Sequence, residues 1–312
     1  MKAISTLAGH THARFLKLYE KDKRNAMNGK KVCVVGMGIM GSGIVQTCAQ
    51  AGYDVSVVNK SEKSLEKGLG KIKKDLSRLV KKGRVEQAEV DRLLDAIRAN
   101  ATMSLEEGTK DADFVIEAVS EDLELKKEIF RNLDMISPEH AILGSNTSTF
   151  SITALAAVTK IPGRVIGVHF MNPVPQMRGV EIIKSLLTSE DTLNSTLEFV
   201  HSLGKETVVV NDSPGFVTSR MMCLILNEAV KMRESGLASV EDIDKIQKLS
   251  FNWPLGPFQL LDLIGIDIVV AVLNTIYNET GFERFKPAVL MVQMVRAGWT
   301  GQKAGKGFYE YK

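Results

Sequence analysis

Short apolar runs alternate with longer amphipathic stretches through the first two thirds of the chain. Each run is about four residues long, nearly all apolar, and separated from the next by a stretch with helical spacing. Such runs are typical of parallel strands that are buried on both faces of a sheet. We predict strands at Val32–Val35, Val55–Val58, Phe114–Glu117, Ala141–Leu143 and Val165–Val168.

The stretch between the second predicted strand and about residue 100 is too long for a single crossover helix. Residues 62–82 and 86–98 have helical spacing on either side of Gly83. We therefore predict two helices that form a hairpin standing off the sheet.

Beyond Pro214 the strand pattern ends and the chain becomes helical and strongly apolar. Ser239, followed three residues later by Asp242, resembles the start of a capping box. The first helix of this part is apolar around most of its circumference, so it must be buried in a core or against another subunit. The predicted helices cover residues 216–234, 239–249, 260–278 and 287–297.

Length and composition are those of a globular protein with roughly two domains. The chain has 312 residues, of which 44% are hydrophobic and 25% charged. We divide it into an extension at 1–28, a sheet domain at 29–212 and a helical domain at 213–312. The extension carries Phe15, Leu16, Leu18 and Tyr19, and we interpret it as a peripheral arm without a chemical role.

Charge and apolar run length argue against nucleic-acid and membrane partners. The 40 basic and 37 acidic residues leave a formal charge of only +3, and aromatic residues make up 6% of the chain. No uninterrupted apolar run approaches the length of a membrane span, and residues 1–28 hold no signal core. We expect a cytoplasmic protein.

The cysteines and histidines favour neither disulfides nor a metal site. Cys33, Cys48 and Cys223 are odd in number and lack the C-x-x-C spacing, so we expect free, buried thiols. His10 and His12 are close in sequence but have no evident third ligand. No metal is expected.

A glycine-rich turn follows the first predicted strand and precedes a helical stretch. Gly36 permits the tight turn, Gly38 lets the backbone approach a pyrophosphate, and Gly41 lets the helix pack closely on the strand. Ile39 and Met40 complete the turn, whose helix N-terminus offers N–H groups to phosphates. Because the turn lies between a strand and a helix, with a second strand after it, we expect it to bind a dinucleotide.

The residue that closes the second strand bears on the choice between NAD and NADP. An acidic residue is usual here for NAD, because it accepts a hydrogen bond from the ribose 2′-hydroxyl. This chain has Asn59, followed by Lys60. Asn59 can still bond a hydroxyl but does not repel a 2′-phosphate, and Lys60 either attracts one or simply faces solvent. The cofactor is therefore predicted as NAD, with NADP left open.

Candidate catalytic groups gather between residues 145 and 181. Ser148 lies in a tetrapeptide after a predicted strand, where ligands bind in open α/β sheets. His169 ends the next strand, and Glu181 lies in a later apolar run. A carboxylate bonded to one imidazole nitrogen raises the basicity of the other, as the oxidation of an alcohol requires. A structural histidine and an exposed edge glutamate remain the alternative.

The ordered set of motifs resembles the short-chain L-3-hydroxyacyl-CoA dehydrogenase family from about Lys31 to Lys312. The motifs that carry the resemblance are Gly36–Gly41, Ser145–Thr149, His169–Pro175, Asp212–Phe216, Pro254–Phe258 and Gly305–Tyr309. The resemblance implies an α/β fold, with a Rossmann-type doubly wound sheet, a helical hairpin insertion and an all-α C-terminal domain. It also implies reversible, nicotinamide-dependent oxidation of an L-3-hydroxyacyl-CoA to the 3-ketoacyl-CoA.

The resemblance further implies roles for individual residues. His169 is the general base, Glu181 orients it, and Ser148 contacts the substrate oxygen and the cofactor. Further cofactor contacts are implied at Glu121, Lys126, Asn172 and Lys303, and Asn172 is also a candidate for contact with substrate. The hairpin resembles a clamp over the CoA tail, whose phosphates would meet some of its lysines, among them Lys71, Lys73 and Lys74. A homodimer through the helical domain is also implied.

The chain departs from the family pattern at three places. Asn59 replaces an acidic residue, Ser219 stands where members often carry an active-site asparagine, and the extension at 1–28 is not shared. We expect Ser219 to alter substrate contact without abolishing activity. Two other functions remain as alternatives: a β-hydroxyacid dehydrogenase that acts on a free acid, and a non-catalytic dinucleotide-binding protein.

Overall fold

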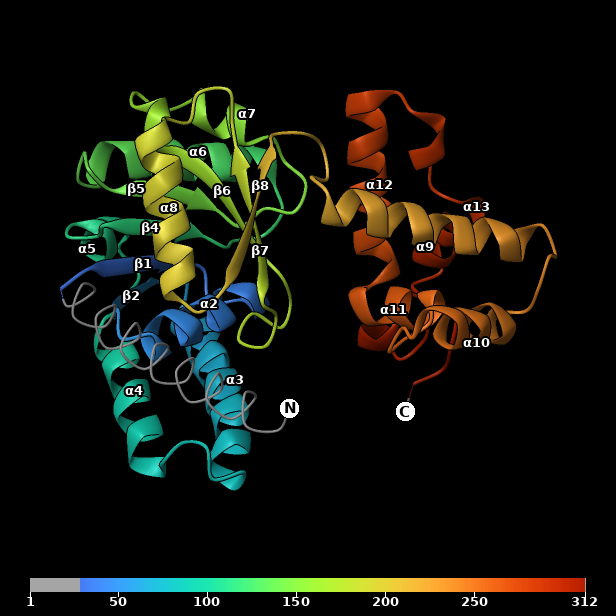
Figure 1. Ribbon diagram of the computed structural model, residues 1–312, viewed down its shortest axis with the longest axis horizontal. Helices are drawn as coiled ribbons and strands as arrows, with labels where there is room; N and C mark the ends of the chain where they lie inside the picture. Colours follow the sequence, from blue (N-terminus) through green and yellow to red (C-terminus); the bar gives the residue numbers. More distant parts are fainter. Residues whose placement is uncertain (1–28, 312) are drawn as a thin grey trace, which may run out of the picture. The chain divides into compact units, whose positions relative to one another are not determined.

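The computed structural model describes residues 29–311, so the predicted extension at 1–28 lies outside the described residues. Within this range the chain forms two compact units (Figure 1). Unit 1 comprises residues 29–147 and 152–212, and unit 2 comprises residues 148–151 and 213–311.

Unit 1 is built on one eight-stranded sheet with the strand order β3-β2-β1-β4-β5-β6-β7-β8. The first six strands pair in parallel, β7 is antiparallel to β6, and β8 is parallel to β7. The chain changes direction across the sheet between β1 and β4, and such a switch point is where open α/β sheets bind ligands. The strands are β1 (Lys31–Val35), β2 (Asp54–Val58), β3 (Ala101–Thr102), β4 (Phe114–Glu117), β5 (Ile142–Ser145), β6 (Val165–Phe170), β7 (Gly179–Lys184) and β8 (Glu206–Asn211).

The predicted doubly wound sheet is confirmed, together with its five predicted strands. The sequence interpretation did not predict β3 and β8. The first is only two residues long. The second is an edge strand whose Val208 and Val209 are 59% and 46% exposed, so it lacks the continuous buried run that marks the inner strands.

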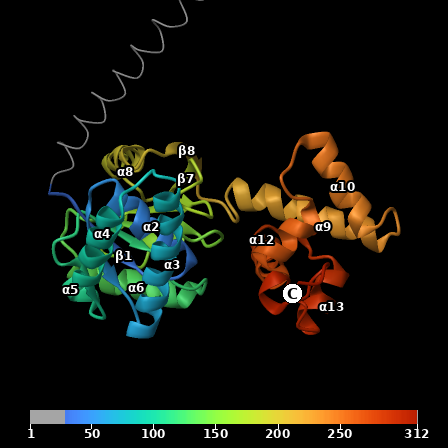
Figure 2. The same ribbon diagram turned by 90° about the horizontal axis from the view of Figure 1, so that it is seen from below.

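Helices cover both faces of the sheet, with α8 on one side and α6 on the other (Figures 1 and 2). The face under α8 holds the main apolar core, in which Phe114 of β4 stacks on Phe199 of α8 at 4.3 Å between ring centroids. The helical segments of this layer structure are α2 (Ile39–Gln50), α5 (Leu105–Thr109), α6 (Leu123–Ile136), α7 (Ile152–Ala156), α8 (Glu190–Ser202) and the 3-10 turn η1 (Pro162–Arg164).

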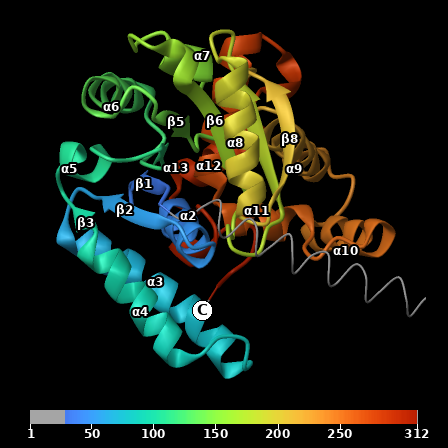
Figure 3. The same cartoon turned by 60° about the vertical axis from the view of Figure 1, so that its left-hand side comes forward.

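The predicted helical hairpin is confirmed as α3 (Glu62–Lys81) and α4 (Gln87–Ala99), which stands off the sheet (Figure 3). The connection turns at Gly83, whose φ of 63° favours glycine. Helix α3 begins at Ser61, whose hydroxyl accepts a hydrogen bond from the Ser64 amide.

Unit 2 is helical, as predicted, but the helix expected at 260–278 is wrong as a single element. Two helices, α11 and α12, occupy this region and are bent by 93°. The break falls at Gly265, whose φ of 109° is incompatible with a continuous α-helix. The elements of unit 2 are α9 (Thr218–Glu234), α10 (Val240–Phe251), α11 (Pro257–Ile264), α12 (Ile266–Thr280), α13 (Val289–Arg296) and the 3-10 turns η2 (Glu283–Phe285) and η3 (Gln302–Ala304).

Capping and burial explain how unit 2 is held together. The Ser239 hydroxyl accepts a hydrogen bond from the Asp242 amide at 3.1 Å, which confirms the predicted start of α10. The fully buried Asp262 accepts hydrogen bonds from the Phe308 and Tyr309 amides, so it fixes the end of the chain to α11. Among the described residues, no single helix combines the length and apolarity needed to cross a bilayer; only the bent pair α11–α12 passes when counted together.

Candidate active site

His169 and Glu181 meet because β6 and β7 pair in the antiparallel sense. They are direct partners in the register of the two strands, and directly opposed residues project their side chains from the same face. The imidazole Nδ1 lies 2.7 Å from the Glu181 Oε2 atom, and both side chains are less than a tenth exposed, at 7% and 6%. This is a buried histidine–carboxylate pair.

The carboxylate decides which nitrogen of His169 can act as a base. A carboxylate only accepts hydrogen bonds, so Nδ1 must carry the proton in the pair. The Nε2 atom then holds the lone pair in the neutral ring and can accept a proton from a ligand. The arrangement is therefore suited to general base chemistry.

The loop after β5 is fastened to the strands on both of its sides. The Asn146 amide donates to the backbone oxygen of Glu117 at 2.8 Å, and its side-chain oxygen accepts from the Phe170 amide at 2.9 Å. This loop runs into Ser148, which is half-buried. The chain thus fixes the segment leading to Ser148 beside the residue that follows His169.

The glycine turn has the shape that a dinucleotide requires. A Cβ atom at Gly36 would lie 2.7 Å from the Ala118 oxygen, and one at Gly41 would lie 1.8 Å from the Gly36 oxygen. A Cβ at Gly38 would meet nothing within 4 Å, so the backbone there faces open space. Gly38 also begins α2 without a side chain to cap it, which leaves the first amides of the helix for phosphate oxygens. The residues present therefore fit a pyrophosphate group.

Asn59 directly follows β2 and is 8% exposed. Its side-chain oxygen accepts from the Lys60 amide at 3.1 Å, and its amide nitrogen lies 3.5 Å from the Ser61 oxygen. The side chain therefore shapes the turn that leads into α3. It brings no charge to the end of β2.

Lys126 lies in an ionic cluster at the end of β4, in which Glu117 is buried and Glu121 is 43% exposed. The Lys126 side chain is 1% exposed, and its ammonium lies 2.7 Å from the Glu117 carboxylate and 3.4 Å from that of Glu121. The sequence interpretation missed Glu117. The sequence did contain a signal for it, namely a carboxylate at the end of an apolar strand. Burying a charge is costly unless it is paired, so a charge at this position indicates a buried partner.

The other predicted site residues occupy varied surroundings. Asn172 follows β6 and is exposed, and it lines a small hollow together with Ser42 and Gly43 of α2. In unit 2, Ser219 is 6% exposed within α9, and the Lys303 ammonium lies 2.6 Å from the Asp267 carboxylate.

The lysines of the hairpin are not equivalent. Lys71 is half-buried and donates a hydrogen bond to the Ile39 oxygen at 3.2 Å, whereas Lys73 and Lys74 are exposed. Desolvation by burial lowers the pKa of Lys71, although the nearby Asp75 opposes this. Lys71 thus connects α3 with the glycine turn.

The described cysteines are not suited to nucleophilic catalysis. Cys33, Cys48 and Cys223 are free and buried, as predicted. Burial raises the pKa of each thiol to about 12, so the reactive thiolate is scarce at neutral pH. Within residues 29–311, no group of three histidine, cysteine or acidic side chains could hold a metal ion.

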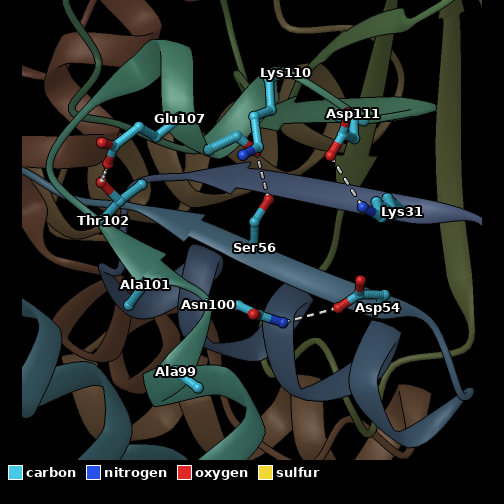
Figure 4. A pocket seen from close by; sticks show the side chains of 12 residues that line it. Lys31, Asp54, Ser56, Ala99, Asn100, Ala101, Thr102, Glu107, Lys110 and Asp111 are labelled. Carbon is cyan, nitrogen blue, oxygen red and sulfur yellow. Dashed lines mark hydrogen bonds and ion pairs between the residues drawn. The ribbon is translucent and has the colours of Figure 1, made fainter.

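A hollow of about 360 Å³ lies near the amino ends of β1 and β2, away from these residues (Figure 4). Several of its polar groups pair with one another. The ammonium of Lys31 pairs with Asp111, Asn100 donates to Asp54, and the Thr102 hydroxyl donates to Glu107. We therefore place the candidate active site at the carboxyl ends of the strands.

Comparison with known proteins gives matches over both units. Residues 31–213 match the profile of the 3-hydroxyacyl-CoA dehydrogenase NAD binding domain, and residues 215–311 match that of the 3-hydroxyacyl-CoA dehydrogenase C-terminal domain.

Individual relatives match over almost their full lengths. The chain is 43% identical to a probable 3-hydroxybutyryl-CoA dehydrogenase of Bacillus subtilis, over 92% of this chain and 99% of that protein. It is also 43% identical to the 3-hydroxybutyryl-CoA dehydrogenase of Clostridioides difficile, over 90% and 99% of the two chains. The crystal structure of (S)-3-hydroxybutyryl-CoA dehydrogenase from Ralstonia eutropha matches with a TM-score of 0.85 and 42% identity, over 91% and 99%.

Proposed function

This chain belongs to the 3-hydroxyacyl-CoA dehydrogenase family, and we propose that it acts on short 3-hydroxyacyl-CoA thioesters through His169. It catalyses the NAD-dependent oxidation of 3-hydroxyacyl-CoA, a reaction that is reversible. The names of its bacterial relatives support a four-carbon acyl group as the preferred substrate. The observation that carries the assignment of His169 is its buried hydrogen bond with Glu181.

The proton of the substrate hydroxyl goes to His169. When bound, the nicotinamide supplies an acceptor for the hydride that leaves the same carbon. The Nε2 atom of His169 takes the hydroxyl proton, and the ring becomes an imidazolium. Glu181, at 2.7 Å from Nδ1, stabilises that cation and holds the ring in orientation. Glu181 is thus a positioning residue.

The cofactor is held by the glycine turn and by the carboxyl ends of the neighbouring strands. Gly38 and the first amides of α2 would receive the pyrophosphate, and Asn59 would contact the adenine-side ribose. Since Asn59 is neutral, discrimination against the 2′-phosphate of NADP is weak. Glu121, Lys126 and Asn172 would contribute further contacts, and Ser148 would hydrogen-bond the substrate oxygen.

The consumption of NADH with acetoacetyl-CoA, followed by NADH absorbance, tests this function. We expect turnover by the wild-type protein and its loss in the His169→Gln variant. Free acetoacetate serves as the control substrate, because it lacks the thioester and the CoA tail. Turnover of acetoacetate without turnover of acetoacetyl-CoA would assign the chain to free acids instead. A series of longer 3-ketoacyl-CoA substrates then tests the preference for short chains.

Two copies of the chain pair through unit 2. Helix α9 supports this proposal, because Met221 and Ile225 in its apolar segment 221–226 are 61% and 40% exposed. Light scattering on the purified protein measures the mass directly. We expect a dimer that the Met221→Lys variant weakens, and a wild-type monomer at micromolar concentration would contradict the proposal.

A further inference from the structure

The carboxylate of Glu117 is completely buried at the carboxyl end of β4. Its Oε1 atom accepts hydrogen bonds from the Lys126 ammonium at 2.7 Å and from the Val119 amide at 2.8 Å. Its Oε2 atom accepts from the Ser145 hydroxyl at 2.7 Å. Three donors from three segments thus fix both oxygens in place.

Stability alone does not account for a fully buried pair of charges. Removing a carboxylate and an ammonium from water is so costly that well-packed apolar residues of similar size often stabilise a protein as much or more. The location of the pair gives a better reason for it. Glu117 is the register partner of Val35, the last residue of β1, and the next residue, Ala118, packs against Gly36 of the glycine turn.

Lys126 is poised to donate once more. An ammonium has three N–H donors. Among the described residues, the Glu117 carboxylate accepts one of them at 2.7 Å, and the Glu121 carboxylate pairs with the ammonium at 3.4 Å. One donor is left for an oxygen of a bound dinucleotide, such as a ribose hydroxyl. The direction of that donor depends on the strong, short contact with Glu117.

We infer that Glu117 is a positioning residue of the dinucleotide site, which holds the Lys126 ammonium in place and aims it at the cofactor. The inference rests on the proposed cofactor contact of Lys126 and deepens it. Glu117 itself touches no cofactor atom. Its carboxylate acts by compensating the buried ammonium and by holding its Nζ atom beside the ends of β1 and β4.

The affinity for NADH in the absence of substrate tests this inference, measured by the fluorescence of bound NADH. The Glu117→Gln variant keeps the side-chain shape but loses the charge. We expect its dissociation constant to rise about 10-fold or more, as for the loss of a hydrogen bond to a charged group. Lys126→Met should raise the constant by a similar factor.

A double-mutant cycle shows whether Glu117 acts through Lys126. In the Lys126→Met background, Glu117→Gln should change the constant by less than about twofold, since the cation it positions is gone. This double variant also removes both charges together, so it leaves no uncompensated buried charge and is expected to fold even where Glu117→Gln alone does not. Independent effects that multiply in the double variant would overturn the inference.

A second buried ion pair in unit 1 provides the matched control. Arg164 and Asp134 lie 3.0 Å apart, and their side chains are 5% and 3% exposed. Asp134→Asn should lower the melting temperature as Glu117→Gln does but leave the NADH constant within about twofold. If the NADH dissociation constant rises equally in both variants, or does not rise in Glu117→Gln, the role of Glu117 is merely structural. Wild-type protein that binds no NADH would instead contradict the proposed function itself.

Discussion

Charged side chains at the amino ends of β1 and β2 are exposed, whereas those at the carboxyl ends of β4 and β6 are buried. At the amino ends, the Lys31–Asp111 pair is 3.1 Å long and its side chains are 43% and 56% exposed. At the carboxyl ends, the Glu117–Lys126 pair is 2.7 Å long and essentially inaccessible. The His169–Glu181 pair is buried at the same edge.

This difference separates charges that solvent stabilises from charges that the protein itself must stabilise. Water screens an exposed pair, and its contribution to the free energy of unfolding is small. A buried pair needs fixed partners for every charge, and those partners fix its geometry. The carboxyl end of β4 therefore contains prearranged charges, whereas the amino ends of β1 and β2 do not, although all three strands belong to one sheet.

The largest effect is expected when His169, the proposed general base at the carboxyl edge, is replaced. His169→Gln should reduce turnover about 10²–10⁴-fold, the usual contribution of a positioned general base. The NADH dissociation constant should stay within about twofold, because the base acts on the substrate hydroxyl.

His201 provides a control for His169 within unit 1. It lies in α8, and its Nε2 atom is 2.8 Å from the Thr207 hydroxyl. His201→Gln should leave the rate of NADH consumption unchanged. Near-normal turnover in His169→Gln would show that His169 is not the general base.

Between the two ends of the strands, the buried thiol of Cys33 should stay protonated at neutral and mildly alkaline pH. Burial raises the pKa of the Cys33 thiol in β1 to about 12, against an ordinary value of 9.0, despite a hydrogen bond with Ser56. At mildly alkaline pH, this lowers the thiolate fraction by roughly 10³-fold. Labelling with a thiol reagent should therefore be slower in the native protein by at least this factor than in guanidinium chloride.

The same shift predicts the direction of the pH dependence of stability. The thiol stays protonated in the folded state but ionises above about pH 9 in the unfolded chain. The contribution of the shift is fully present below that pH and is lost as the pH rises towards about 12. Denaturant titrations across this range should show a falling free energy of unfolding, whereas rapid native labelling of all three cysteines would contradict the burial.

A new charge at the end of β2 should change the preference between cofactors. Asn59→Asp places a carboxylate where it repels a 2′-phosphate and accepts from a 2′-hydroxyl. The ratio of kcat/KM with NADH to that with NADPH should rise by about 10-fold, the size of a single charged hydrogen bond. Asn100→Asp, at the amino edge beside Asp54, is the matched control and should leave this ratio unchanged.

The smallest effect is expected from the exposed pair at the amino edge. Asp111→Asn removes the partner of Lys31, and the free energy of unfolding should change by less than about 1 kcal/mol. The rate of NADH consumption should not change. A larger loss of stability in urea titrations would show that the amino edge also depends on prearranged charge.

Most of the strand and helix pattern of this protein can be predicted from local features of its sequence. Apolar runs gave the inner strands, the break at Gly83 gave the hairpin, and the glycine turn gave the end of β1 and the start of α2. These features depend on local periodicity and on backbone freedom at single glycines, and both are visible in a one-dimensional string. The motifs also singled out His169 and Glu181 as candidates.

Which of these groups lie in contact depends on how the strands pair in the folded sheet. The 2.7 Å contact between His169 and Glu181 requires the antiparallel register of β6 and β7, and the cluster around Glu117 requires the ends of β4 and β5 to lie side by side. The break at Gly265 was missed because apolar residues continue on both sides of it. The edge strand β8 was missed because its apolar run is only three residues long, Val208–Val210. Side-chain contacts between strands depend on pairing and register, and these are properties of the folded sheet.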